Sequence, residues 1–130
     1  MKIEKMTKED IGECLELLKQ LTVAGNFDYE EVFEKINSEI FVAKIDNKVV
    51  GMASIFIEQK LLRFGGKVGH IEDVVVDSNF RGKGIGKKFC ISVAKESKCY
   101  KVILDCDIDN TNFYNKCGFS EYGVCMRKNL

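Results

Sequence analysis

The 130-residue chain contains no proline, and it has no glycine- or serine-rich linker, low-complexity tract or internal repeat. Domain boundaries usually carry such segments, so their absence predicts a single domain over residues 1–130. Long apolar runs are also missing, and the charged first ten residues do not resemble a secretory signal. We therefore expect a soluble, cytoplasmic protein.

Net charge is absent as well, because 20 basic and 20 acidic side chains cancel. No overall field draws the protein to nucleic acid or to an anionic membrane, so anion binding must depend on local arrangement. Histidine is limited to His70, and the six scattered cysteines form no CxxC pair. We expect no metal site, and we expect free thiols in a reducing compartment, mostly as small core residues.

Hydrophobic periodicity predicts helices and strands in alternation. Capping signals at Thr7 and Asp28 mark two helix starts, and the strand, helix and strand after residue 68 predict a parallel crossover. In chain order we expect a strand at 3–6, helices at 11–21 and 28–36, strands at 41–45, 49–57 and 68–76, a helix from 86 to about 98, a strand at 102–104, a helix at 110–117 and a strand at 122–127.

A glycine-rich turn lies between a buried strand and a helix; its residues are Arg81, Gly82, Lys83, Gly84, Ile85 and Gly86. Backbone N–H groups at a helix start bind anions, and glycine allows close approach of a phosphate. No register fits the GxxxxGK[ST] P-loop. GxGxG also differs from the dinucleotide GxGxxG, although Asp105 follows the next strand where a ribose-binding acid is expected. The turn predicts an anion site, with nucleotide binding left open.

Two adjacent acids, Glu72 and Asp73, interrupt an otherwise apolar strand. Burying them unpaired is costly, so they favour either a polar ligand at this point or a bulge that exposes them. A weaker possibility is RNA binding at residues 81–88, which lacks the aromatic platform that base stacking requires.

Three sequence motifs carry a family resemblance. Arg81, Gly84 and Gly86, read as RxxGxG, resemble the acyl-CoA loop of the GNAT acetyltransferase superfamily. Its NxxFYxxxGF signature resembles Asn110, Phe113, Tyr114, Gly118 and Phe119. The segments GHIEDVVV, CYKVILDCD and FYNKCGF are similar to eukaryotic glucosamine 6-phosphate N-acetyltransferases over residues 21–127.

This resemblance implies an α/β (α+β) fold with a mixed, mostly antiparallel sheet, a splayed parallel strand pair and flanking helices. It implies direct transfer of acetyl from acetyl-CoA to the amine of glucosamine 6-phosphate, a step toward UDP-N-acetylglucosamine, without a covalent enzyme intermediate. It also implies a homodimer with sites near the subunit interface. Two alternatives remain open: a GNAT acting on a protein lysine, an N-terminus or a polyamine, and a non-catalytic module that binds acyl-CoA or a nucleotide.

Individual roles follow from the same resemblance. Tyr114 is expected to act as the acid for the leaving thiolate, with Asp105 and Glu72 at the amine. Acetyl-CoA is expected to contact Glu72, Asp73, Val74, Val75, Val76, Arg81, Gly82, Lys83, Gly84, Ile85, Gly86, Asn110 and Tyr114. The sugar phosphate is expected to contact Thr22, Lys60, Arg63, Glu72, Asp73, Asp105 and Arg127.

Overall fold

Five strands form one sheet in the order in which they follow along the chain. They are β1 (Lys2–Lys5), β2 (Glu39–Ile45), β3 (Lys48–Gln59), β4 (Lys67–Val76) and β5 (Lys101–Ile103). Neighbours from β1 to β4 pair antiparallel, whereas β5 pairs parallel to β4. The computed structural model describes residues 1–23, 25–96 and 98–130. Its mixed sheet confirms the predicted fold class.

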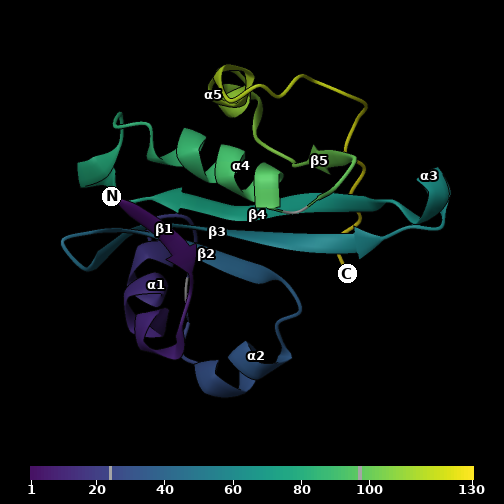
Figure 1. Ribbon diagram of the computed structural model, residues 1–130. Helices are drawn as coiled ribbons and strands as arrows, with labels where there is room; N and C mark the ends of the chain where they lie inside the picture. The colour runs from purple at the N-terminus through teal and green to yellow at the C-terminus, as the bar shows by residue number, and fades with distance from the viewer. Residues whose placement is uncertain (24, 97) are drawn as a thin grey trace.

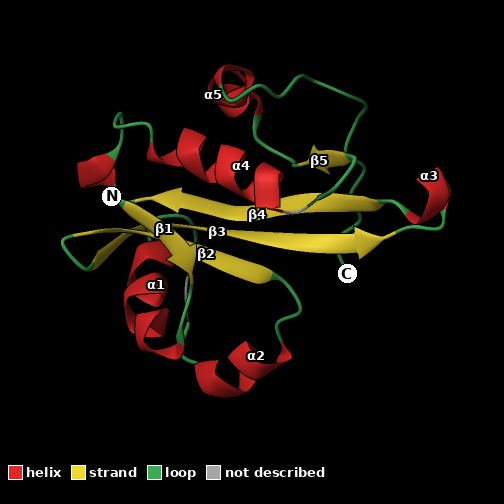
Figure 2. Cartoon of the chain, in the orientation of Figure 1, coloured by secondary structure: helices red, strands yellow, loops and turns green. Residues whose placement is uncertain are grey.

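Helices cover both faces of this sheet (Figures 1 and 2). On one side lie α4 (Ile85–Glu96) and α5 (Thr111–Lys116), and on the other lie α1 (Ile11–Leu18) and α2 (Tyr29–Lys35). Three 3-10 turns, η1 (Lys8–Asp10), η2 (Ser78–Phe80) and η3 (Ile108–Asn110), and the single turn α3 (Leu62–Gly65) complete the described elements. None of the described helices combines the length and apolarity needed to cross a membrane.

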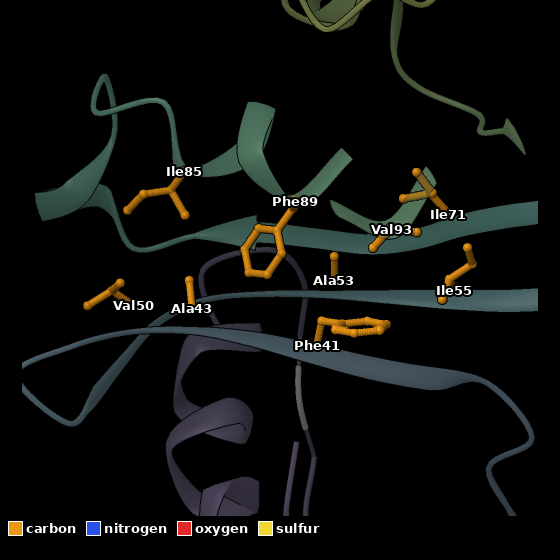
Figure 3. Packing of buried hydrophobic residues seen from close by; sticks show 9 residues of the cluster. All are labelled: Phe41, Ala43, Val50, Ala53, Ile55, Ile71, Ile85, Phe89 and Val93. Atoms are coloured by element: carbon orange, nitrogen blue, oxygen red, sulfur yellow. The ribbon is translucent and has the colours of Figure 1, made fainter. Parts of the chain in front are cut away.

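Two apolar clusters hold the layers together. The first lies between the sheet and α4 and centres on Phe89, whose side chain is fully buried (Figure 3). The second lies between the sheet and α1 and includes Val75. Because Val74 and Val76 pack against the first cluster while Val75 belongs to the second, both faces of the end of β4 are covered, as its unbroken apolar run predicts.

One predicted strand is wrong. Residues 122–127 form no strand, although their apolar side chains alternate: Tyr122, Val124 and Met126 are 98%, 85% and 88% exposed. A strand needs a neighbour to satisfy its backbone hydrogen bonds, and within the described chain no strand pairs with this segment. The apolar alternation is present in the sequence, but no described residue of the chain buries these side chains.

Two helix ends also differ from the prediction. The first helix, α1, ends at Leu18 and continues as a turn instead of reaching residue 21. The crossover helix, α4, ends at Glu96, and the predicted extension through Ser97 lies outside the described residues. Lys98 is not helical and has a φ of 50°, which no right-handed helix accommodates.

Candidate functional site

The glycine turn leads from η2 into the first residues of α4. Gly82 and Gly84 adopt φ values of 78° and 76°, in the left-handed region where side chains are disfavoured. Gly86 is needed for a different reason, because a Cβ there would lie 2.6 Å from Cζ of Phe113. The turn therefore brings exposed backbone to a helix start, and α5 packs directly on that start.

The side chains of the turn have distinct surroundings. Arg81 donates from Nε to the carbonyl oxygen of Val76 at 3.1 Å, which ties the turn to the end of β4. The Lys83 ammonium lies 4.9 Å from the centre of the Phe80 ring. The side chain of Ile85 is 2% exposed and belongs to the core, so of this residue only the backbone can face a ligand.

The middle of β4 is irregular on both of its edges. It has a bulge opposite β3, and it separates from β5 on the other side. Met52 pairs with Val75, but Ser54 pairs with Glu72, so β4 has one more residue than β3 at this point. Asp73 lies in the bulge with a φ of 51°. The pairing of β4 with β5 covers only residues 68–70 of β4, so from Ile71 onward no described strand pairs with this edge. The predicted splay is confirmed, and the exposed Glu72 and Asp73 match the bulge alternative.

One of the predicted acids contacts the C-terminal segment. Asp105, which follows β5, accepts a hydrogen bond from Cys125 Sγ at 3.4 Å. This bond is the main reason that the pKa of Cys125 is raised; the charge of Glu72 adds to the rise and that of Arg127 opposes it. Asp105 therefore contacts Cys125 directly, whereas Glu72 and Arg127 act on this thiol only through their charges.

Asp73 is directed elsewhere. Its carboxylate accepts a hydrogen bond from Ser54 Oγ at 3.5 Å, and the same hydroxyl donates to the carbonyl oxygen of Glu72 at 3.1 Å. Ser54 therefore fixes the bulge on the β3 side, whereas Asp105 follows β5 and contacts the C-terminal segment.

Tyr114 lies on α5, held between two aromatic rings. Its ring meets Phe113 edge to face with centroids 5.0 Å apart, and Phe119 in the same way at 6.0 Å. Burial, followed by the nearby thiols of Cys90, Cys106 and Cys117, raises the pKa of Tyr114 to about 12. The phenol is therefore protonated at neutral pH and available as a donor. Asn110, at the N-cap of α5, is exposed.

The side chains predicted to contact the phosphate group come from three segments: the turn after α1, the hairpin loop and the C-terminal segment. Lys60 and Arg63 lie in the hairpin loop that contains α3, where the Lys60 ammonium binds Glu58 Oε1 at 3.0 Å and the Arg63 guanidinium lies 5.5 Å from the centre of the Tyr100 ring. Thr22 is exposed in the turn after α1. The role of Thr22 in binding the phosphate stays a prediction.

Several contacts at the site were missed by sequence reasoning: Ser54 at the bulge, Cys125 at Asp105, and Glu58 at Lys60. Alternation along β3 places Ser54 and Glu58 on one face, which is a usable signal once the register of the hairpin is known. Nothing in the pattern around Cys125 indicates its position.

The cysteine prediction is correct in part. None of the six cysteines forms a disulfide, and Cys14 and Cys90 are buried as expected. Cys106 and Cys125 are exposed, which contradicts the core assignment for those two, because they lie in irregular segments outside both apolar clusters. Within the described residues no group of three or more His, Cys, Asp or Glu side chains is arranged to hold a metal ion.

Comparisons with known proteins agree with this geometry. A model of the acetyltransferase (GNAT) family matches residues 7–119. The glucosamine 6-phosphate N-acetyltransferase of Arabidopsis thaliana is 46% identical over 127 residues, which cover 88% of this chain and 85% of the relative. The protein of that name from Trypanosoma brucei brucei is 36% identical over 141 residues, covering 100% and 96%. The crystal structure of the Arabidopsis thaliana enzyme superposes with a TM-score of 0.87 at 44% identity, covering 98% and 97% of the two chains.

Proposed function

This chain belongs to the acetyltransferase (GNAT) family, and we propose that it transfers the acetyl group of acetyl-CoA to the amine of glucosamine 6-phosphate. The product would be N-acetylglucosamine 6-phosphate, a precursor for UDP-N-acetylglucosamine. The observation that carries the proposal is the set of relatives named for this activity, which match nearly the whole chain at 36% to 46% identity.

The donor end of the proposed site is formed by backbone. The N–H groups at the start of α4, together with Arg81 and Lys83, suit the pyrophosphate of coenzyme A. The unpaired edge of β4 beyond His70 can hydrogen-bond an extended arm as an added strand would. Gly86 and Phe113 connect this end to α5, which keeps Tyr114 near the point where the thioester would lie.

The chemistry needs an uncharged amine, a polarised carbonyl and a stabilised thiolate. We assign Asp105 and Glu72 to the amine, because Asp105 follows β5 and Glu72 lies at the bulge of β4, beyond the point where its pairing with β5 ends. The backbone of β4 from Glu72 to Val76 faces the same opening and would polarise the thioester oxygen. Tyr114, protonated at neutral pH, would donate to the sulfur. The attack is direct, so no covalent enzyme intermediate is invoked.

The acceptor phosphate needs cations, and we assign it to Lys60 and Arg63 in the hairpin loop, with Thr22 and Arg127 as further contacts. Support for Arg127 is electrostatic: its charge lowers the pKa of Cys125, the thiol that donates to Asp105. A GNAT acting on a protein lysine, an N-terminus or a polyamine has no need of cations at this end.

A homodimer is part of the proposal. The C-terminal segment passes from the α4 side of the sheet to the α1 side (Figure 1) and exposes Tyr122, Val124 and Met126 at alternating positions. A second copy would cover these side chains and supply a strand neighbour for the segment. Light scattering during size-exclusion chromatography is expected to give twice the 14.8 kDa chain mass, and a monomer would contradict this part. The presence of six cysteines without a disulfide favours a reducing compartment such as the cytoplasm.

Release of free thiol from acetyl-CoA tests the proposed reaction. Purified protein is expected to release thiol when glucosamine 6-phosphate is supplied, and far less with glucosamine, a lysine peptide or spermidine. Equal turnover with unphosphorylated glucosamine would refute the assigned substrate, whereas preference for the peptide or the polyamine would favour another GNAT activity. Binding of acetyl-CoA without turnover on any amine would indicate a non-catalytic module.

A further inference from the structure

Three polar side chains form a connected group at the β3–β4 hairpin. The Glu58 carboxylate accepts a hydrogen bond from Lys60 Nζ at 3.0 Å on one oxygen and contacts His70 Nε2 at 2.9 Å with the other. Because a carboxylate only accepts, the Nε2 atom of His70 must carry the hydrogen in this contact. The sole histidine of the chain therefore orients the carboxylate that holds Lys60.

This group shares a face of the sheet with Glu72. His70 precedes Glu72 by two residues on β4, so both side chains point to the same side, about 6.6 Å apart along the strand. On β3 the register places Phe56 opposite His70, and its ring lies 6.1 Å from the imidazole. Through Glu58 and His70, Lys60 is thus connected to the face of the sheet that carries Glu72, an acid assigned to the acceptor amine.

The backbone around Lys60 is fixed independently of this group. The amide of Gln59 donates from Nε2 to the carbonyl oxygen of Gly65 at 2.7 Å, and the Lys60 N–H donates to the carbonyl oxygen of Gly66 at 2.9 Å. The conformational freedom that remains belongs to the Lys60 side chain. This side chain is long and loses much rotamer entropy when its ammonium is fixed by a partner.

We propose that His70, acting through Glu58, positions the Lys60 ammonium for the acceptor phosphate and thereby sets the preference for a phosphorylated amino sugar. The proposal rests on the proposed function and extends it to two residues that contact neither donor nor acceptor. In support, the hydrogen bond from Lys60 and then that from His70 hold the pKa of Glu58 below its usual range. The same contact with Glu58 raises the pKa of Lys60.

The test compares His70→Ala with His70→Gln, whose side-chain amide can replace the Nε2 donor. At saturating acetyl-CoA, His70→Ala is expected to raise KM for glucosamine 6-phosphate about two- to fivefold, which corresponds to roughly 0.4–1 kcal/mol for the loss of one partly exposed hydrogen bond. Both kcat and KM for unphosphorylated glucosamine stay unchanged, and His70→Gln restores the wild-type KM. An unchanged KM in His70→Ala, or no rescue by glutamine, would overturn the proposal.

A double-mutant cycle separates positioning from direct contact. In a Lys60→Met background, His70→Ala is expected to cause no further change; an equal rise in KM there would show that His70 contacts the acceptor itself and overturn the proposal. Lys67→Met is the matched control, since Lys67 is exposed on the opposite face of β4 and should leave KM unchanged. A wild-type protein without turnover on glucosamine 6-phosphate refutes the proposed function, whereas failure of the variants alone refutes only this inference.

Discussion

Replacing Tyr114 with phenylalanine removes one hydroxyl and keeps the ring that packs between Phe113 and Phe119. The pKa of Tyr114, about 12, is set chiefly by burial, whereas an ordinary thiol has a pKa of about 8.5. Full proton transfer to the leaving thiolate would therefore run uphill by about 3.5 pKa units, or roughly 5 kcal/mol. A hydrogen bond to the developing negative charge involves no such step.

A hydrogen bond to a charged group contributes about 1.5–3 kcal/mol. Tyr114→Phe is therefore expected to lower kcat about 10- to 150-fold and to leave KM for acetyl-CoA nearly unchanged. The thiol-release assay at several pH values measures this directly. In the wild type, activity should show no loss from ionisation of the phenol below about pH 11, because the pKa of Tyr114 lies near 12.

The outcome that refutes this reasoning is an unchanged kcat, which would assign Tyr114 to packing alone. A fall in kcat accompanied by a lower melting temperature would point to the same conclusion, since the variant keeps both ring contacts and should fold normally. Binding of acetyl-CoA, followed by calorimetry, controls for an altered donor site.

Three further substitutions test the packing and the ion pair that stabilise the fold around the site. Gly86→Ala places a Cβ 2.6 Å from Phe113 and should cost about 1–3 kcal/mol in unfolding free energy and raise KM for acetyl-CoA; an unaltered urea midpoint would contradict the close approach. Phe89→Ala empties the centre of the α4 cluster and should cost about 3–5 kcal/mol in the same measurement. Burial alone would raise the pKa of Asp10, but the bonds from Lys44 and Thr7 outweigh it and keep the pKa low. Asp10→Asn should therefore cost about 1–3 kcal/mol at pH 7, and that difference should disappear as the pH falls below about 4; a constant difference would contradict the ion pair.

The geometry of the glycine turn, the proposed donor end of the site, was predictable because its determinants are local. A buried strand, three glycines and a helix follow one another within residues 74–96, and the left-handed φ values of Gly82 and Gly84 are those that glycine spacing suggests. The sheet was predictable for a related reason, since apolar alternation and short turns define the hairpins β2–β3 and β3–β4. The absent strand at 122–127 shows the limit of prediction from sequence. Alternation there indicates which side chains would be buried in a strand, but it does not indicate which segment would pair with that strand.

The acceptor end depends on contacts that no local pattern encodes. Asp105 meets Cys125 across twenty residues, and Glu58 meets His70 through a register that the left-handed turn at Arg63 and Phe64 helps to set. These contacts come from separate segments, whereas the donor loop is continuous. On the proposed assignment, a substitution in the hairpin loop or the C-terminal segment would therefore change which amine is accepted while the donor loop stays intact. This independence is the physical reason that a glycine loop alone identifies the donor and leaves the acceptor open.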